Sequence, residues 1–370
     1  MSSRKKIIHI VPTLERGGSE MSQLRMLPLI EEHIESIFVT LKNPGPLAEN
    51  FKAKGIQVFS VNQKGLWDLL SYYRLVRLLR KLQPDLIITH LLYADIVGRF
   101  FVQFFVSCKV IESLATTYNF PSYWLARLFE RTTHFLADGY IANAEIVKKT
   151  CVEKFGIPEK KVFVLTTGMD IEYFQQLQPK AVLAQELGIQ PQETVIICVA
   201  NLHINKGHRY LLEAFEVLYQ KNNAVRLLLV GDGAEKENIT RQREKLSAKE
   251  KILLLGKRSD VPDLLALSHI FALPTFFEGM CNAIMEAMAM GIPVVTTNIP
   301  ENQELVTHEK NGMLCPVKDI SCLAHSLERL VTDISVRQTM GQAARESMQE
   351  RYNLPDSTKR WETLFLSLSQ

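Results

Sequence analysis

The chain lacks several features that mark particular protein classes. None of its six cysteines forms a C-x-x-C pair, which argues against a structural zinc site and favours buried, reduced thiols. The longest apolar run, near residues 97–106, is interrupted by Arg99 and Gln103 and is shorter than the roughly 20 residues that span a bilayer. The N-terminus is not a signal peptide, because polar Glu15 and Arg16 follow its short apolar run at once. We therefore expect a cytoplasmic protein.

The chain also lacks a surplus of charge. Its 43 Lys and Arg against 40 Asp and Glu leave a formal net charge of +3, which is too small to indicate a nucleic-acid partner. A hydrophobic fraction of 46% and a charged fraction of 22% are ordinary for a soluble globular protein. A length of 370 residues favours two domains over one.

Short β-branched runs alternate with longer amphipathic ones, and the alternation starts again after about residue 178. This pattern predicts parallel sheets with helices on both faces. We expect an α/β protein of two doubly wound, Rossmann-like domains, over residues 1–177 and 178–355, with a helix at 356–370 packing back on the first. Open sheets of this kind bind ligands at the carboxyl ends of their strands, so two facing domains place the site in a cleft. The expected strands include KKIIHIV, ESIFVTL, IQVFSV, DLIITH, TVIICVA, AVRLLLV, KILLLG, HIFALP and IPVVTT.

Lys206 is the first candidate site residue. In ICVANLHINKGH it stands between the end of a strand and the start of a helix. A helix N-terminus carries partial positive charge and free N–H groups, so a lysine beside it suits a phosphate. An ordinary surface lysine in a loop is an equally good reading of the spacing alone.

Glu278 and Glu286 are the second candidates. In FFEGMCNAIMEAMAMGIPVV they stand with seven residues between them, Glu278 in a loop and Glu286 inside the helix that follows. The helix start is a natural seat for a diphosphate, and a carboxylate such as Glu286 could accept two ribose hydroxyls. A glutamate on so apolar a helix needs a partner. The alternative is that Glu278 favours the helix dipole and Glu286 is solvated.

The first half of the chain offers weaker signals. Gly17 and Gly18 follow the first strand, and adjacent glycines permit close approach of a ligand, although a simple turn is commoner. His90 ends the strand DLIITH, where a site role and a core or capping role are about equally expected. The dinucleotide fingerprint fails at VGDGAEK, because Lys236 holds the third glycine position.

Together these segments resemble the retaining glycosyltransferases of family four, which have the GT-B architecture. The resemblance covers nearly the whole chain. It rests on the two glutamates followed by AMAMGIPVV, on NLHINKGH, on VLTTGMDIEYF and on LLLVGDG, in the family's order. It departs from the family at Asn201, where an arginine is usual, and at Thr167, where an asparagine is usual. It departs also in VIESLATTYNF, which lacks the family's histidine, so His90 becomes the first-domain candidate.

The resemblance implies roles for these residues. Lys206 would hold the donor diphosphate, Glu286 the ribose, and Glu278 the donor sugar or its phosphate. Gly17 and Gly18 would close over the diphosphate, and Glu278, Lys206 and His90 would be the catalytic residues. The remaining donor-binding positions would be Asn201, Arg258, Gly279, Met280, Cys281 and Asn282. No Asp-x-Asp stands at a strand end, so we expect no metal and no cofactor, the nucleotide-sugar being a substrate.

The implied activity is transfer of a sugar from a UDP- or GDP-linked donor to a hydroxyl of a glycan or a lipid-linked acceptor, with retention, in envelope polysaccharide synthesis such as that of lipopolysaccharide. The alternatives are a nucleotide-sugar epimerase of the same architecture and an inactive nucleotide-sugar-binding protein. The basic, aromatic helix KGLWDLLSYYRLVRLLRKL fits peripheral contact with an anionic membrane on its cytoplasmic side, or simply a packed helix with a solvated face.

Overall fold

The computed structural model describes residues 4–15, 17–65, 67–114 and 124–370, without the side chains of Ala126 and Arg127. The chain divides into two compact units. Unit 1 comprises residues 1–168 and 354–370, and unit 2 comprises residues 169–353. The boundary therefore falls before the short helix at residues 171–176, whereas the sequence pattern predicts it after that helix. The two crossings between the units lie side by side, since the Met169 N–H donates to the Tyr352 carbonyl at 2.7 Å.

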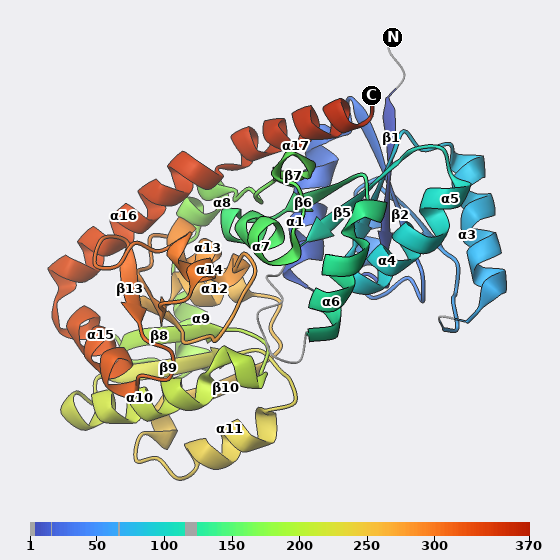
Figure 1. The fold of residues 1–370 in the computed structure, drawn as a ribbon. Coiled ribbons are helices and arrows are strands. Elements are labelled where there is room, and N and C mark those ends of the chain that lie inside the picture. Colours follow the sequence, from blue (N-terminus) through green and yellow to red (C-terminus); the bar gives the residue numbers. More distant parts are fainter. Residues whose placement is uncertain (1–3, 16, 66, 115–123) are drawn as a thin grey trace. The chain divides into compact units, whose positions relative to one another are not determined.

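Unit 1 is built on a seven-stranded parallel sheet in the order β3-β2-β1-β4-β5-β6-β7. Figure 1 labels β1, β2, β5, β6 and β7 of this sheet. The expected segments KKIIHIV, ESIFVTL and DLIITH pair side by side, and Ile8 of the first lies opposite Ile37 of the second and Ile87 of the third. Each strand is short and contains at least one β-branched residue, and β1, β2 and β4 are rich in them, as buried parallel strands are. The strands are β1 (Lys5–Val11), β2 (Ile34–Thr40), β3 (Gln57–Ser60), β4 (Leu86–His90), β5 (Lys109–Leu114), β6 (Gly139–Ala142) and β7 (Val162–Val164).

Helices cover both faces of this sheet and enclose two separate apolar cores. One core includes Phe38 and Phe365, and the other includes Leu75 and Val97. The Trp361 indole N–H donates to the Thr166 carbonyl at 2.9 Å, which fixes the C-terminal helix on unit 1. The helices are α1 (Gly18–Met26), η1 (Leu27–Ile30), α2 (Ala48–Ala53), α3 (Leu69–Leu82), α4 (Leu91–Val97), η2 (Gly98–Val102, a π-helical turn), α5 (Gln103–Phe105), α6 (Trp124–Thr133), η4 (His134–Leu136), α7 (Glu145–Phe155), η5 (Glu159–Lys161) and α17 (Leu354–Leu368).

Unit 2 repeats the design on a six-stranded parallel sheet in the order β10-β9-β8-β11-β12-β13. Its strands are β8 (Thr194–Val199), β9 (Val225–Val230), β10 (Ile252–Gly256), β11 (Ile270–Leu273), β12 (Val294–Thr297) and β13 (Gly312–Cys315). Its helices are α8 (Ile171–Gln176), α9 (Ala181–Glu186), η6 (Ile204–Lys206), α10 (His208–Lys221), α11 (Lys236–Arg243), η7 (Lys249–Lys251), α12 (Val261–Ala266), α13 (Asn282–Ala289), α14 (Pro300–Gln303), α15 (Ile320–Thr332) and α16 (Ile334–Tyr352).

Capping residues set several of these boundaries. Asp68 begins α3 by accepting the Ser71 N–H at 3.2 Å, and Gln83 ends the helix in the left-handed conformation at φ 51°. Pro28 explains why α1 stops at Met26, since a proline cannot donate within a continuing α-helix. No helix of the described residues is both long and apolar enough to cross a membrane.

The cysteines differ in part from the expectation of reduced thiols. Cys108, Cys151, Cys198 and Cys281 are free, but Cys315 and Cys322 form a disulfide with their Cα atoms 5.6 Å apart. Cys315 ends β13 and Cys322 lies in the first turn of α15. The turn between these elements brings the two residues within disulfide range, which their spacing in the sequence did not indicate.

Candidate functional site

The carboxyl ends of β8 and β11 in unit 2 carry the two residues that the motifs single out most strongly. Lys206 ends η6, after the loop that follows β8, and Glu278 lies in the loop between β11 and α13. Lys206 Nζ contacts Glu278 Oε1 at 2.5 Å. The Lys206 side chain is 19% exposed and that of Glu278 is 9% exposed, so the pair is largely but not wholly removed from water.

Close backbone packing explains why this pair forms. Gly207 has φ +70°, and a Cβ there would lie 2.0 Å from the Pro274 carbonyl oxygen. The Asn205 carbonyl accepts the Phe276 N–H at 2.8 Å and the Thr275 hydroxyl at 3.0 Å. Only glycine permits this approach. The η6 turn is thereby fixed against the loop that carries Glu278.

The glycines of VGDG, which follow β9, pack against the loop that precedes Lys206. A Cβ at Gly231 would lie 2.0 Å from the Ala200 carbonyl oxygen, and one at Gly233 would lie 2.4 Å from that of Leu202. Leu202 N–H in turn donates to the Asp232 carbonyl at 3.0 Å. These glycines therefore pack the β9 turn against the loop before Lys206, which is a structural reason for a motif that failed as a dinucleotide fingerprint.

The electrostatics of the pair favour a cation in a confined place. Burial alone would lower the pKa of Lys206, but the Glu278 carboxylate beside it raises that pKa above its ordinary value. Burial raises the pKa of the neighbouring Cys198 and Cys281 thiols to about 12. Burial, with Lys206 nearby, lowers the pKa of His208 to about 4. At neutral pH Lys206 is therefore cationic, whereas the two thiols and His208 beside it are uncharged.

The other expected donor-site residues lie on neighbouring elements. Cys281 is the N-cap of α13, and Glu286 lies half-buried within that helix. Asn201 is exposed in the loop after β8. Arg258 is held by Asp260, whose two carboxylate oxygens accept from Nε at 2.8 Å and Nη2 at 2.6 Å. Arg258 thus has its own counter-ion, a feature that the motif did not show. Gly279, Met280 and Asn282 form the half-buried turn into α13.

In unit 1, His90 lies at the end of β4 as the N-cap of α4 and is 7% exposed. Both of its ring nitrogens are engaged: Nε2 lies 3.0 Å from His9 Nδ1, and Nδ1 lies 3.0 Å from Gln23 Nε2. Burial lowers the pKa of His90 to about 3, and burial with His90 lowers that of His9 well below its usual range. The histidines are neutral, so His90 is better placed to hold Gln23 than to exchange a proton.

Sequence reasoning missed His9 and Gln23. His9 is a lone polar residue in the strand KKIIHIV, stacked on Phe38 with ring centroids 4.9 Å apart, and Gln23 lies on α1. The polar residue inside an otherwise apolar strand was the available signal. Gly17 is the N-cap of α1 and Gly18 its first residue, and the extended backbone of Gly17 does not require glycine.

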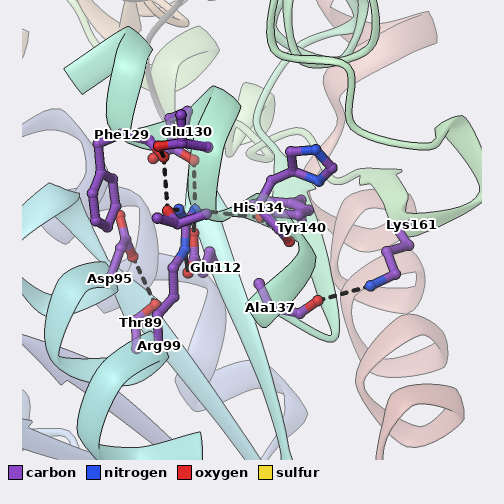
Figure 2. A network of polar contacts seen from close by, with 12 residues as sticks. Thr89, Asp95, Arg99, Glu112, Phe129, Glu130, His134, Ala137, Tyr140 and Lys161 are labelled. Atoms are coloured by element: carbon purple, nitrogen blue, oxygen red, sulfur yellow. Dashed lines mark hydrogen bonds and ion pairs between the residues drawn. The ribbon is translucent and has the colours of Figure 1, made fainter. Parts of the chain in front are cut away.

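One further polar cluster lies inside unit 1. Among the described residues, Asp95, Glu112 and Glu130 form the group of acidic side chains whose oxygens lie close enough to hold a metal ion. The Arg99 guanidinium already contacts two of them, through Glu112 Oε1 at 2.5 Å and Glu130 Oε2 at 2.5 Å (Figure 2). Arg99, Glu112 and Glu130 are all 0% exposed. This cluster already holds a cation, the Arg99 guanidinium.

Comparisons with known proteins agree with this architecture. The sequence model described as Glycosyltransferase Family 4 matches residues 16–173, and that of Glycosyl transferases group 1 matches residues 180–347. The chain is 26% identical to the Escherichia coli UDP-Gal:alpha-D-GlcNAc-diphosphoundecaprenol alpha-1,3-galactosyltransferase, across 99% of this chain and 98% of that protein. It is 26% identical to the Staphylococcus aureus capsular polysaccharide glycosyltransferase CapM, across 77% of each.

The fold also matches solved structures. The Anabaena HepE protein in complex with UDP and glucose superposes with a TM-score of 0.86 at 21% identity, over 98% of this chain and 100% of that one. Two parallel sheets and these two matched sequence models, which between them span both units, show that the chain is a glycosyltransferase of the family-four type with the GT-B fold.

Proposed function

We propose that this glycosyltransferase moves a sugar from a UDP- or GDP-linked donor to a hydroxyl of a glycan or lipid-linked acceptor in envelope polysaccharide synthesis, with retention of the anomeric configuration. The single observation that carries the proposal is the Lys206–Glu278 pair, which holds a cation at the carboxyl end of the unit 2 sheet. The names of the relatives support the substrate classes. The E. coli relative uses a UDP-sugar and a diphosphoundecaprenol-linked acceptor, and the HepE structure contains UDP.

Lys206 supplies the electrostatic work of the reaction. As the bond between sugar and diphosphate breaks, negative charge grows on the departing phosphate, and a preorganised cation in a partly dry site stabilises it. Glu278 keeps Lys206 charged and oriented before the donor binds. When the diphosphate takes Lys206, Glu278 becomes free to contact the sugar. Glu286, farther along α13, accepts the ribose hydroxyls.

This chemistry needs no metal and no cofactor, because Lys206 and the start of α13 carry the positive charge that a divalent ion would otherwise supply. Gly17 and Gly18, at the start of α1, are assigned to diphosphate binding by the family resemblance. His90 fixes Gln23 on α1, the helix that these glycines begin. Asn201 replaces the usual arginine, so Lys206 carries more of the charge.

The acceptor proposal includes a membrane. A lipid-linked acceptor lies in the bilayer, and α3 exposes Arg74, Arg77, Arg80 and Lys81. Cations on an amphipathic helix attract anionic lipid headgroups. We place the enzyme on the inner face of the cytoplasmic membrane as a peripheral protein.

The test is a thermal-shift screen of nucleotide-sugars and UDP, with and without EDTA. A bound donor raises the melting temperature by mass action, and EDTA should leave the shift unchanged. The shift should vanish in Lys206→Ala and persist in the control Lys310→Ala, which alters an exposed lysine between α14 and β13 of unit 2.

The best donor is then assayed with a short-chain diphospholipid-linked sugar, and NMR of the product reports the anomeric configuration. Donor binding without turnover on any acceptor would favour an inactive binding protein. Interconversion of the donor without an acceptor would favour an epimerase.

A further inference from the structure

Four helical elements, α3, η2, α5 and α6, lie together over one face of the unit 1 sheet. The Tyr72 ring of α3 stacks on Phe101 of η2 with centroids 3.9 Å apart. Arg80 of α3 donates to the Phe105 carbonyl of α5 at 3.1 Å. The ring centroids of Phe100 of η2 and Phe129 of α6 are 6.2 Å apart. Because each element contacts the next, their outer sides form one continuous surface.

This surface is anchored from beneath. Arg99 of η2 bonds to Glu112 of β5 and to Glu130 of α6, so one buried guanidinium ties both helical elements to the sheet (Figure 2). Asp95 of α4 accepts the Thr89 hydroxyl of β4 at 2.6 Å in the same layer. The outward side chains of η2, α5 and α6 are therefore presented by elements with fixed positions.

The outer side of the layer is unusually apolar. Phe104 is 65% exposed, Phe135 67% and Trp124 57%. Soluble proteins rarely leave several large aromatic and aliphatic side chains exposed together without a partner. We call this set the aromatic face; its members are Leu70, Tyr73, Phe100, Phe104, Phe105, Trp124, Leu125, Leu128 and Phe135.

The charges around the aromatic face are mostly positive. On α3, η2, α5 and α6, the described charged side chains that are exposed are Arg74, Arg77, Arg80, Lys81 and Arg131. The acidic residue on these elements, Glu130, is fully buried beneath Arg99. Two carboxylates also lie at this border: Asp68, 3.7 Å from Arg74, and the exposed Asp138, which accepts from Gln103 of α5. Because the five cations outnumber them, the face is complementary to a surface that is apolar within and anionic at its edge.

We propose that the aromatic face is the surface by which this enzyme docks on an anionic lipid membrane. The Phe and Leu side chains enter the apolar boundary of the bilayer, and Tyr73 and Trp124 lie at the headgroups with their polar atoms in water. The cations contact lipid phosphates. This rests on the proposed function, since a lipid-linked acceptor requires the enzyme at the bilayer. It extends the contact from α3 alone to η2, α5 and α6.

Charge disfavours a second copy of the chain as the occupant. In a two-fold interface the same surface meets itself, so the cations of one copy would face those of the other. Asp68 and Asp138, the described carboxylates at its border, are too few to pair with the five cations of a second copy. Like charges opposed across an interface cost free energy, whereas lipid phosphates supply the missing negative charge.

The experiment measures co-sedimentation of the full chain with vesicles. The parent protein should bind phosphatidylglycerol–phosphatidylethanolamine vesicles and not pure phosphatidylcholine vesicles. Phe104→Gln with Leu128→Gln should weaken binding by roughly tenfold or more, because two apolar side chains no longer enter the bilayer. Arg77→Gln with Lys81→Gln should weaken it by about tenfold at low salt and less at high salt. Glutamine preserves helix propensity at all four positions.

The matched control is Val182→Gln with Lys245→Gln, which removes an exposed apolar side chain and an exposed cation from unit 2. It should bind vesicles as the parent does. The proposal fails if the parent does not bind anionic vesicles, or if the aromatic-face variants bind as the control does. It fails also if the parent self-associates without binding vesicles and the aromatic-face variants are monomeric.

Donor binding separates this proposal from the proposed function. All of these variants should keep the UDP-induced thermal shift, since none lies at the Lys206–Glu278 pair. If vesicle binding depends on the aromatic face but no nucleotide-sugar raises the melting temperature, the membrane-docking proposal stands and the proposed donor chemistry fails. If UDP raises the melting temperature but the parent does not bind vesicles, the donor chemistry stands and the membrane-docking proposal fails.

Discussion

Each unit buries a cluster of opposite charges, and the two clusters differ in what remains available. In unit 1, Arg99 is fully buried between Glu112 and Glu130, with the Thr133 hydroxyl as a further acceptor. In unit 2, Lys206 has one carboxylate partner and keeps 19% of its side chain exposed. A cation surrounded by protein acceptors can only hold structure together. A cation with one partner and access to solvent can exchange that partner for a ligand.

The strongest way to test this contrast is to remove the structural cation. Arg99→Met would leave Glu112 and Glu130 buried without a counter-ion, at a cost of about 3–5 kcal/mol in the free energy of unfolding. The three tryptophans, Trp67, Trp124 and Trp361, all lie in unit 1. Tryptophan fluorescence during urea unfolding therefore reports unit 1 alone.

The triple variant Arg99→Met, Glu112→Gln, Glu130→Gln should recover part of the loss, because the uncompensated charges are gone. A single variant as stable as the parent would show that the cluster is not a structural anchor. The UDP-induced thermal shift of unit 2 should survive in variants that remain folded.

The same cluster should make unit 1 sensitive to pH. Burial raises the pKa of Glu112 to about 7, and burial raises that of Asp95 well above its usual range. The pKa of Glu112 is higher in the folded protein than its unfolded value of 4.5. The stability that protonated Glu112 contributes is therefore fully present below pH 4.5 and is lost as the pH rises towards 7.

The neutral histidines act in the other direction. The pKa of His90 is lowered from 6.5 to about 3, so its contribution is lost as the pH falls through that interval. Urea midpoints from tryptophan fluorescence across this range should fall less steeply with rising pH in Glu112→Gln than in the parent. Equal slopes would contradict the raised pKa. We expect a smaller effect than loss of Arg99.

In unit 2, Glu278→Gln tests whether Lys206 exchanges partners. The diphosphate must displace Glu278 from Lys206, so removing the carboxylate should let UDP bind roughly tenfold more tightly, the value of one charge-assisted hydrogen bond. Transfer should nevertheless fall by about 10²-fold, since Glu278 no longer contacts the sugar. Calorimetry with UDP and a turnover assay measure the two effects. Weaker UDP binding would contradict the exchange.

Glu286→Gln should have the smallest effect. If Glu286 accepts the ribose hydroxyls, its loss raises the KM for the donor by about tenfold with little change in kcat, because binding to the ribose is the same in ground and transition states. A matched control is Glu237→Gln on α11, an exposed glutamate of the same unit. An unchanged KM would remove Glu286 from the donor site.

Much of the fold was predictable because it depends on local patterns. The strands KKIIHIV and TVIICV appear at β1 and β8, and the helix HRYLLEAFEVLYQK coincides with α10. The sequence pattern predicts the boundary between the units too late, because α8 resembles a continuation of the first domain. In the structure Met169 pairs with Asn353, which assigns α8 to unit 2. The segment at 97–106 was noted only as an apolar run, although it forms η2 and α5 of the aromatic face.

The candidate site likewise has features that the sequence predicts and features that only the tertiary structure shows. By itself the sequence determined two series of buried strands and the order of Lys206, Glu278 and Glu286, because burial and helix starts leave short, regular signatures in the chain. Only the tertiary structure joined Lys206 to Glu278 across a sequence separation of 72, and enclosed Arg99 between Glu112 and Glu130. Such pairs depend on the paths of loops, as where Gly207 touches Pro274. A loop path is set by packing between distant segments, which no local pattern records.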